Sequence, residues 1–372
     1  MEMPLQLAST LRFPHISWAT FQLMKRIHFH MTISIGLTGG GNISETHARA
    51  VRAIPGAELV AVYGTKRERL EKFATEFGAK TFDSLEAFLA HRPMEMVILG
   101  SPSGLHAEEG IAAAKHGLHV LTEKPVDIST ARVDALIAAT TAAGVKLGVL
   151  FQDRVKPGIR RMKELIDSGA IGTPIFAEAR VKWFRPEEYY GKSRWRGTIA
   201  LDGGGALINQ AVHTIDLLQW MMGDVVRVQA KTATVLHKIE GEDTAAVILE
   251  FANGALGTLH ATTSVYPGYP RRVEISGTKG TLILEHDRLV AADLRDGQGS
   301  ELVSGAGDTN QSASTAVVSD FSGHQKLIED FIQAIQQNRK PVCDGSDGRK
   351  SVALLEAIYQ AARKSRELAI TV

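Results

Sequence analysis

The segment GLTGGGNIS, residues 36–44, decides the fold of the first half of this chain. It follows a short apolar run at 33–37 and precedes a helix-like run. Gly39 and Gly41 match the first two glycines of a G-x-G-x-x-G pattern, and the small residue Ser44 stands in the third place. A strand, a tight glycine turn and a helix N-terminus in this order predict a site for the pyrophosphate of a dinucleotide. The expected cofactor contacts here are Gly39, Gly41, Asn42 and Ile43.

Alternating strand and helix signals continue as far as residue 151. Short apolar runs predict strands, and segments with apolar residues on one helical face predict helices. The expected strands are 33–37, 59–63, 96–99, 120–121 and 145–151, and the expected helices are 44–53, 66–77, 105–116 and one around 133–140. This alternation predicts an α/β fold with a parallel, doubly wound sheet over residues 31–152.

From Pro174 onward, apolar and polar residues alternate one by one, which is typical of a strand with one wet face. The expected strands are 175–183, 226–236, 244–251, 255–264, 272–276 and 281–284. Asn253-Gly254 between two of them predicts a hairpin, because both residues tolerate positive φ. We therefore expect a second, α+β domain with a mostly antiparallel sheet at 153–372. It would also hold a long loop or lid at 293–323 and helices at 325–338 and 348–366.

Composition limits the classes of partner. Lys and Arg total 42 against 41 Asp and Glu, a net charge of +1, which gives no electrostatic case for nucleic acid or an anionic membrane. No apolar run approaches the roughly 20 residues of a membrane span. The single cysteine, Cys343, fits a reducing compartment, so we expect a cytoplasmic protein. Residues 1–30 lack a sustained period and a compact apolar signal core, and we interpret them as a disordered or dispensable extension.

The end of the second strand bears on the choice of dinucleotide. An acidic residue that binds the ribose is expected about 20 residues after the glycines, but this strand ends in Gly64-Thr65-Lys66-Arg67. A missing carboxylate removes repulsion against a 2′-phosphate, and Thr65, Lys66 and Arg67 offer it a hydroxyl and two cations. We therefore expect NADP to be accepted and preferred over NAD. The alternative is that Lys66 and Arg67 only solvate the start of a helix.

The tripeptide Glu123-Lys124-Pro125 follows the short strand that begins at 119. Proline lacks an amide donor and restricts the residue before it to extended conformations, so the chain leaves the sheet here. A lysine at the carboxyl end of such a strand lies where open α/β sheets bind ligands. A plain surface exit from the strand is the alternative.

A third motif, LDGGGALINQAVHTID at 201–216, lies in the second half. On an α-helix Asn209, His213 and Asp216 would share a face, since they are four and three residues apart. Asp216 would then orient His213, whose ordinary pKa of about 6.5 suits a general base. A structural histidine is the alternative, although the glycine run lets a ligand approach closely. The histidines form no ligand cluster with cysteine or carboxylate, so no metal is expected.

These motifs together resemble the Gfo/Idh/MocA family of oxidoreductases over residues 31–372. The glycine turn, Ser101-Pro102, the E-K-P tripeptide and the helix with Asn209 and His213 occur in that family's order. The resemblance implies a Rossmann domain and a substrate-binding domain whose open sheet pairs subunits into homodimers or homotetramers. It also implies that Lys124 contacts both nicotinamide and substrate. That family typically carries a carboxylate at the position of Asn209, which leaves His213 as the candidate base here.

Hydride transfer from a secondary alcohol needs a base for the hydroxyl proton and positive charge near the developing alkoxide. We expect His213 to take the proton, Lys124 to stabilise the oxygen and Asn209 to position a neighbouring hydroxyl. Further cofactor contacts are expected from Ser101, Pro102, His106, Glu123 and Lys124. The substrate-binding candidates are Arg154, Trp183, Trp195, Arg196, Asn209, His213 and Tyr266, because indoles stack on sugar rings and arginines suit carboxylates or phosphates.

These residues predict an NAD(P)-dependent dehydrogenase that acts on a sugar, a cyclitol or a sugar nucleotide. Two other functions stay open at this point, because the family also contains NAD-dependent glycosidases and cofactor-binding regulators that catalyse nothing. Such regulators tend to lack the lysine and histidine that this chain has at 124 and 213. For the tryptophans, packing in the core is the alternative to substrate binding.

Overall fold

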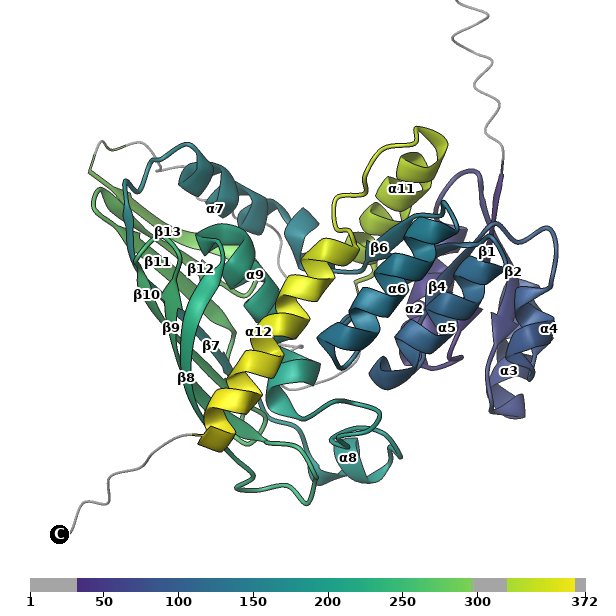
Figure 1. The fold of residues 1–372 in the computed structure, drawn as a ribbon, viewed down its shortest axis with the longest axis horizontal. Helices are drawn as coiled ribbons and strands as arrows, with labels where there is room; N and C mark the ends of the chain where they lie inside the picture. The colour runs from purple at the N-terminus through teal and green to yellow at the C-terminus, as the bar shows by residue number, and fades with distance from the viewer. Residues whose placement is uncertain (1–31, 296, 298–319, 365–372) are drawn as a thin grey trace, which may run out of the picture. The chain divides into compact units, whose positions relative to one another are not determined.

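The computed structural model describes residues 32–295, 297 and 320–364. The extension expected at 1–30 lies outside the described residues, as does most of the loop expected at 293–323. From Ile33 onward the chain forms one structural unit that contains two sheets (Figure 1).

The first sheet is parallel and six-stranded, with the order β3-β2-β1-β4-β5-β6. Its strands are β1 (Ile33–Thr38), β2 (Ala57–Tyr63), β3 (Lys80–Phe82), β4 (Met96–Leu99), β5 (His119–Thr122) and β6 (Leu147–Val149). The helices between them are α2 (Asn42–Arg52), α3 (Arg67–Phe77), α4 (Leu85–Leu89), α5 (His106–Lys115) and α6 (Thr130–Ala142). β1 and β4 are buried along their whole length, as expected for strands covered on both faces. The expected parallel, doubly wound sheet is confirmed.

The strand order of this sheet reverses between β1 and β4. Ligands of doubly wound sheets bind outside the carboxyl ends of the strands at such a reversal. The loop after β1 carries the glycine turn, and the loops after β4 and β5 carry Ser101-Pro102 and Glu123-Lys124-Pro125. All three motifs therefore start from the same edge of the sheet.

The second sheet has seven strands in the order β13-β12-β11-β7-β10-β9-β8. They are β7 (Pro174–Lys182), β8 (Val225–Ala233), β9 (Thr244–Phe251), β10 (Leu256–Thr262), β11 (Arg272–Gly277), β12 (Gly280–Glu285) and β13 (Arg288–Leu294). Neighbouring strands are antiparallel except for β10 with β7, which confirms the expected mostly antiparallel sheet. The predicted hairpin joins β9 to β10, with Gly254 at φ +87° and the Asn253 side chain accepting the Ala255 amide.

Helices α7 (Pro157–Asp167), α9 (Val212–Met222) and α12 (Gly345–Lys364) pack on the second sheet. Figure 1 shows all three on one side of it. The side chains of β9 follow this division, because Val247 and Leu249 are buried while Ala246 and Ile248 are exposed. One face of the sheet thus belongs to the core, and the other carries exposed side chains.

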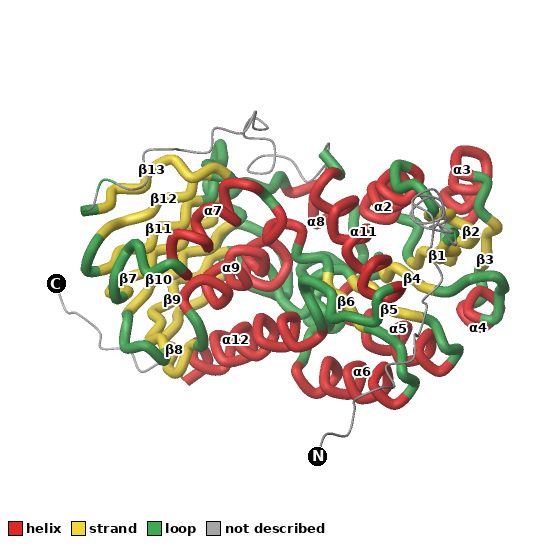
Figure 2. The backbone as a smooth tube through the Cα atoms, turned by 90° about the horizontal axis from the view of Figure 1, so that it is seen from above, coloured by secondary structure: helices red, strands yellow, loops and turns green. Residues whose placement is uncertain are grey.

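The last two helices return to the first sheet. α11 (Ser322–Gln336) packs on α2, and α12 packs on both α6 and β8, as Figure 2 shows from above. Asp344 also forms a β-bridge with Gly148 in the edge strand β6. The two sheets share these C-terminal helices, and a domain division at 152/153 stays a prediction. Residues 365 and 366 of the expected last helix lie outside the described part.

Candidate functional site

The glycine turn after β1 builds the cofactor end of the site. Gly39 and Gly40 have φ of +98° and +61°, which residues with a side chain rarely adopt. A Cβ at Gly39 would clash with the carbonyl oxygen of Gly100, so the loop after β4 lies directly against the turn. Ser44 donates its hydroxyl to the Thr38 carbonyl at 2.9 Å and so holds α2 against β1. This turn and the N-terminus of α2 fit the pyrophosphate of a dinucleotide.

A hydroxyl residue and two cations follow the end of β2. After the buried Gly64 come three exposed residues, Thr65, Lys66 and Arg67. Arg67 donates Nε to Glu71 at 2.9 Å, an exposed pair that contributes little to stability. Arg69 reaches back to the glycine turn, because a Cβ at Gly41 would lie 3.5 Å from its Nη1. Arg69 is therefore a cation beside the turn that the sequence pattern did not single out.

His106 ties the loop after β4 to the E-K-P loop. Its Nδ1 lies 2.9 Å from the Pro125 carbonyl oxygen, and its Nε2 lies 2.9 Å from the Ser101 carbonyl oxygen. Ser101 and Thr38 donate their hydroxyls to the buried Glu109 carboxylate at 2.8 and 2.7 Å. Both ring nitrogens of His106 thus lie against backbone carbonyl oxygens. The side chain holds the two loops together, and neither nitrogen is left to bind a cofactor. Pro102 directly precedes the short helix η1 (Ser103–Leu105) of this loop.

Lys124 connects the two halves of the site. Its Nζ donates to the carbonyl oxygen of Asn209 at 3.1 Å. Burial lowers the pKa of Lys124, while the carboxylates of Glu123, Asp202 and Asp153 oppose that effect. Burial thus disfavours the charged form of Lys124, and the carboxylates around it favour that form.

Glu123 lies behind Lys124 in a buried cluster with two histidines. Its Oε1 is 3.0 Å from His47 Nε2 and 3.8 Å from His324 Nε2, and its Oε2 accepts the Lys124 amide at 3.1 Å. Burial would raise the pKa of Glu123, but His47, His324 and Lys124 hold it at about 2. Burial lowers the pKa of His324 to about 4. Glu123 is thus a charged anchor for the E-K-P loop, with partners from α2 and α11.

The helix that carries the candidate base is not a single α-helix. Residues Ala206–Ala211 form a π-helix, η3, which continues into α9. A π-helix has wider turns, so it changes which side chains share a face. The Asn209 side chain binds Asp202, whereas the His213 ring lies beside Asp153. The prediction of one straight α-helix through this segment is therefore wrong.

Asp216 pairs with Arg154 and not with His213. Its Oδ1 and Oδ2 accept hydrogen bonds from Arg154 at 2.6 and 2.8 Å, and both residues are buried. Arg154 also donates to Asp347 at 3.0 Å. The carboxylate beside the imidazole is that of Asp153, whose Oδ2 lies 3.8 Å from His213 Nδ1. Two predictions are thereby corrected: Asp216 does not orient the base, and Arg154 is held by the carboxylates of the buried Asp216 and the half-buried Asp347 instead of facing a substrate.

His213 is a neutral imidazole at physiological pH. Burial lowers its pKa to about 3, with Asp153 opposing this shift and Lys124 and Arg271 adding to it. Its Nε2 lies 3.4 Å from Nε2 of Gln152. A neutral ring is free to accept a proton, although its low pKa makes it a weak base.

Asp202 is a buried carboxylate in the middle of this group. Its Oδ1 accepts a hydrogen bond from Asn209 Nδ2 at 2.6 Å, and its Oδ2 accepts the Gly197 amide at 2.7 Å. Burial raises the pKa of Asp202 to about 6, against the effects of these two bonds and of Lys124. The candidate site therefore contains a carboxylate close to Lys124, although position 209 itself carries an amide.

Aromatic and cationic side chains form the wall next to Asn209. Tyr189 donates its hydroxyl to Asn209 Oδ1 at 3.2 Å. The Arg196 guanidinium lies 4.1 Å from the Tyr189 ring centroid, and that of Arg185 lies 5.0 Å from the Trp183 ring centroid. We call this set the aromatic–cationic wall; it comprises Trp183, Arg185, Tyr189, Trp195 and Arg196.

Tyr266 stands apart from this wall. Its side chain is 78% exposed, and its ring packs edge-on against Phe184 at 5.3 Å between centroids. A substrate contact of Tyr266 therefore stays a prediction.

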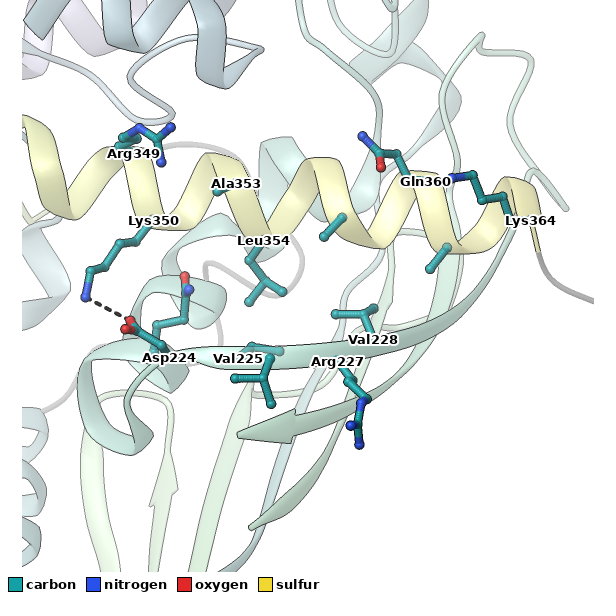
Figure 3. Close-up of a pocket in the computed structure, with 14 residues that line it drawn as sticks. Asp224, Val225, Arg227, Val228, Arg349, Lys350, Ala353, Leu354, Gln360 and Lys364 are labelled. Atoms are coloured by element: carbon teal, nitrogen blue, oxygen red, sulfur yellow. Dashed lines mark hydrogen bonds and ion pairs between the residues drawn. The ribbon is translucent and has the colours of Figure 1, made fainter. Parts of the chain in front are cut away.

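Two surface grooves accompany the second sheet. The first lies between α12 and β8 and ends at an ion pair of Lys350 with Asp224 (Figure 3). None of the predicted site residues lines it. The second is lined by α8 (Glu187–Gly191), by Arg196 and by the loop 237–240. Only the second of these grooves touches the aromatic–cationic wall.

Within the described ranges, no group of three His, Cys, Asp or Glu side chains is arranged to hold a metal ion. The helices in that part of the chain are too short or too polar to cross a bilayer. The thiol of Cys343 is buried, and burial raises its pKa.

Several residues of the site were missed by the sequence pattern. Gln152 and Asp153 lie in η2 (Gln152–Val155), shortly after β6 ends at Val149, and their position beyond the carboxyl end of a parallel strand would have found them. Asp202 opens the glycine run, where an acidic residue in an apolar stretch is a weak signal. The other missed residues lie on helices that pack against the site, and no local sequence signal marks them. They are His47, Arg69, Tyr189 and His324.

Comparisons with known proteins cover both sheets. Residues 33–151 match the model of the oxidoreductase family with an NAD-binding Rossmann fold, and residues 159–283 match the GFO/IDH/MocA C-terminal domain. Inositol 2-dehydrogenase of Rhizobium meliloti is 27% identical, over 91% of this chain and 100% of that protein. Inositol 2-dehydrogenase 3 of Saccharopolyspora erythraea is 30% identical, over 68% of this chain and 73% of that protein.

Among solved structures, the WlbA dehydrogenase from Bordetella pertussis, in complex with NADH and UDP-GlcNAcA, is similar to this chain. The two are 34% identical, with a TM-score of 0.80 and coverage of 90% of this chain and 97% of that one.

Proposed function

Because the chain belongs to the Gfo/Idh/MocA family of oxidoreductases, we propose that it interconverts a secondary alcohol and a ketone on a sugar, cyclitol or sugar nucleotide. The nicotinamide dinucleotide, when bound, supplies the hydride acceptor or donor. One observation carries the proposal: Lys124 Nζ meets the Asn209 carbonyl at 3.1 Å, where the E-K-P loop reaches η3. The neutral His213 lies one turn farther along that helix.

Each of these residues has a defined task in the proposed oxidation. His213 takes the hydroxyl proton, and the Asp153 carboxylate near Nδ1 favours the imidazolium that forms. Lys124 holds positive charge next to the oxygen as negative charge develops on it. Asn209, held by Asp202 and Tyr189, positions a neighbouring hydroxyl. In the reduction the same groups act in reverse.

The aromatic–cationic wall supports a sugar that carries an acidic group. Its rings suit the apolar face of a sugar, and Arg196 suits a carboxylate or phosphate. The related structure holds UDP-GlcNAcA, and the two related curated proteins described above are named for inositol. The first substrates to test are therefore UDP-GlcNAcA and myo-inositol.

The test of this function is an assay of nicotinamide absorbance. The purified protein is mixed with NAD or NADP and a panel of UDP-GlcNAcA, myo-inositol and plain aldoses. Cofactor reduction with one member of the panel is the expected result. Cleavage of an aryl glycoside without net change of the nicotinamide would indicate a glycosidase instead. Cofactor binding without either reaction would indicate a regulator.

We also propose that NADP is preferred over NAD. Lys66, Arg67 and Arg69 supply positive charge beside the cofactor turn, and Gly64 stands where a ribose-binding acid would repel a 2′-phosphate.

Gly64→Asp is expected to lower the affinity for NADPH relative to NADH by about tenfold or more, because like charges brought together cost several kcal/mol. A Cβ at Gly64 would lie 3.3 Å from Leu70 Cδ2, so the end of the Leu70 side chain must shift slightly to admit it. Dissociation constants for both cofactors come from nicotinamide fluorescence. Gly64→Asn is the matched control, with the same size and no charge. Equal affinity ratios in the two variants would refute the electrostatic explanation.

We further propose that subunits pair through the open face of the second sheet. This face carries exposed apolar side chains on three strands, among them Ile248, Leu256 and Phe176. Leu256 stands directly opposite Phe176 in the β10–β7 pair. Apolar side chains gathered on one face are typical of an interface between proteins.

The double variant Ile248→Glu with Leu256→Glu is expected to shift a dimer or tetramer toward monomer, because four carboxylates would meet across a two-fold interface. Light scattering after gel filtration measures the mass. Leu236→Glu is the control, since Leu236 is equally exposed at 57% but lies in the loop after β8. An unchanged mass in the double variant would place the contact elsewhere.

A further inference from the structure

Asp202 is a group that the roles above leave unexplained. It is 1% exposed and precedes the glycine run 203–205. Its carboxylate is held by two neutral donors, the Asn209 amide at 2.6 Å and the Gly197 backbone amide at 2.7 Å. A buried carboxylate costs free energy, and two neutral donors offset this only in part. The unfavourable burial of the Asp202 carboxylate therefore suggests that its negative charge has a function.

The first consequence of Asp202 concerns the amide of Asn209. A carboxylate only accepts hydrogen bonds, so it determines that Nδ2 faces Asp202. The other end, Oδ1, then faces the Tyr189 hydroxyl at 3.2 Å. The backbone carbonyl of the same residue accepts Lys124 Nζ at 3.1 Å. One residue thus connects the carboxylate to the ammonium.

The second consequence concerns charge. Three carboxylates act on the charge of Lys124: Glu123 on its own loop, Asp202 before η3 and Asp153 after β6. One cation, Arg185 after β7, opposes them. His213, which is neutral, also faces this group. Asp202 is faced in turn by Lys124 and Arg196. Asp202 therefore supplies one of the negative charges that compensate the Lys124 ammonium.

We propose that Asp202 is a positioning residue, which orients the Asn209 amide and keeps Lys124 charged while Lys124 is partly buried. The role of Asp202 in catalysis rests on the proposed function. Its effect on Lys124 does not, because the charge state of a lysine can be measured without turnover.

The direction of the effect follows from the groups involved. Burial lowers the pKa of Lys124, and the Asp202 carboxylate raises it. If Asp202 is neutralised, Lys124 loses its proton at a lower pH. An opposite charge nearby shifts a pKa by about one unit or more, so a shift of about one pH unit is expected.

Competitive labelling of the full chain with acetic anhydride measures this shift. Only the uncharged amine reacts, and mass spectrometry of the peptide that contains Lys124 gives the extent of reaction across a pH series. In Asp202→Asn the midpoint is expected about one pH unit below that of the wild type. Asp243→Asn is the matched control, because Asp243 is a buried carboxylate that accepts the amides of Val235, Leu236 and His237. Its midpoint should equal that of the wild type.

A second variant separates charge from orientation. Asp202→Glu keeps the charge but displaces the carboxylate by one methylene, so its midpoint should stay at the wild-type value. NADH binding, followed by nicotinamide fluorescence, verifies that each variant is folded. An unchanged midpoint in Asp202→Asn would overturn the proposal, as would an equal shift in Asp243→Asn. If Asp202→Asn does not fold, a lowered midpoint in Asp202→Glu would overturn it.

Turnover provides the link to catalysis. With a substrate in hand, the alkaline limb of kcat/KM in Asp202→Asn should move by the same pH interval as the labelling midpoint. A merely structural loss would lower kcat/KM at every pH without moving the limb. If the wild-type protein turned over no substrate of the panel, the proposed function would fail while the labelling result stood by itself.

Discussion

Lys124→Ala is expected to lower kcat by about 10²–10³-fold, the loss that follows removal of one group that stabilises a developing oxyanion. The lysine lies at the carboxyl end of β5 and contacts η3 through Nζ, so no neighbouring side chain of that loop can replace its charge. Cofactor affinity should fall much less than kcat, since the glycine turn is untouched. Initial rates and fluorescence titration of NADPH measure the two quantities.

Two variants serve as controls for this result. Lys146→Ala removes a half-buried lysine of the same half of the chain, whose Nζ donates to the Asn338 side chain at 3.0 Å, and should retain full activity. Lys124→Arg keeps the charge with a different shape and should retain part of the activity. A kcat for Lys124→Ala within about tenfold of the wild type, or about 1.4 kcal/mol of barrier, would remove Lys124 from the mechanism.

His213→Ala is expected to lower kcat by about 10²–10⁴-fold, which is the usual contribution of a general base. The pKa of His213 is about 3, so the ring is neutral throughout the neutral and alkaline range. The titration of His213 therefore does not appear in the pH profile in this range. The loss of kcat in His213→Ala should be similar in mildly acidic and in alkaline buffers. Rates measured across that range check this expectation.

Chemical rescue distinguishes a base from a packing residue. Added imidazole should restore part of the activity of His213→Ala, because the vacated space next to Gln152 and Asp153 admits a small base. His260→Ala is the control, since His260 is exposed on β10 and should neither lose activity nor respond to imidazole. Unimpaired turnover of His213→Ala would assign the proton to another group.

Much of the fold was predictable because local sequence patterns determine its turns, strands and helices. Gly39 in the turn and Gly254 in the hairpin have positive φ, and both the turn and the hairpin are where they were expected. β3, α4 and α8 were missed, because three to five residues contain too few repeats of a helical or strand period. α7 was missed although Ile159, Met162 and Leu165 recur at a spacing of three and are buried together.

The candidate site was predictable only at two places, the glycine turn and the lysine after β5. Its centre was predicted less well, since η3 is a π-helix and a local pattern assumes regular α-helical turns. That difference turned Asn209 toward Asp202. Arg154, expected at a substrate, is held by Asp216 in the core.

Sequence by itself determined the α/β alternation of the first half, the mostly antiparallel sheet of the second, the turn that fits a dinucleotide, and the presence of Lys124 and His213 as candidate groups. Only the tertiary structure decided their partners. Lys124 meets Asn209 across 85 residues of chain, and Arg154 meets Asp216 across 62. The periods of helices and strands relate residues a few positions apart, so they carry no information on contacts at such separations. Packing of the two sheets brings these residues together, and with them the carboxylates that determine whether Lys124 is charged.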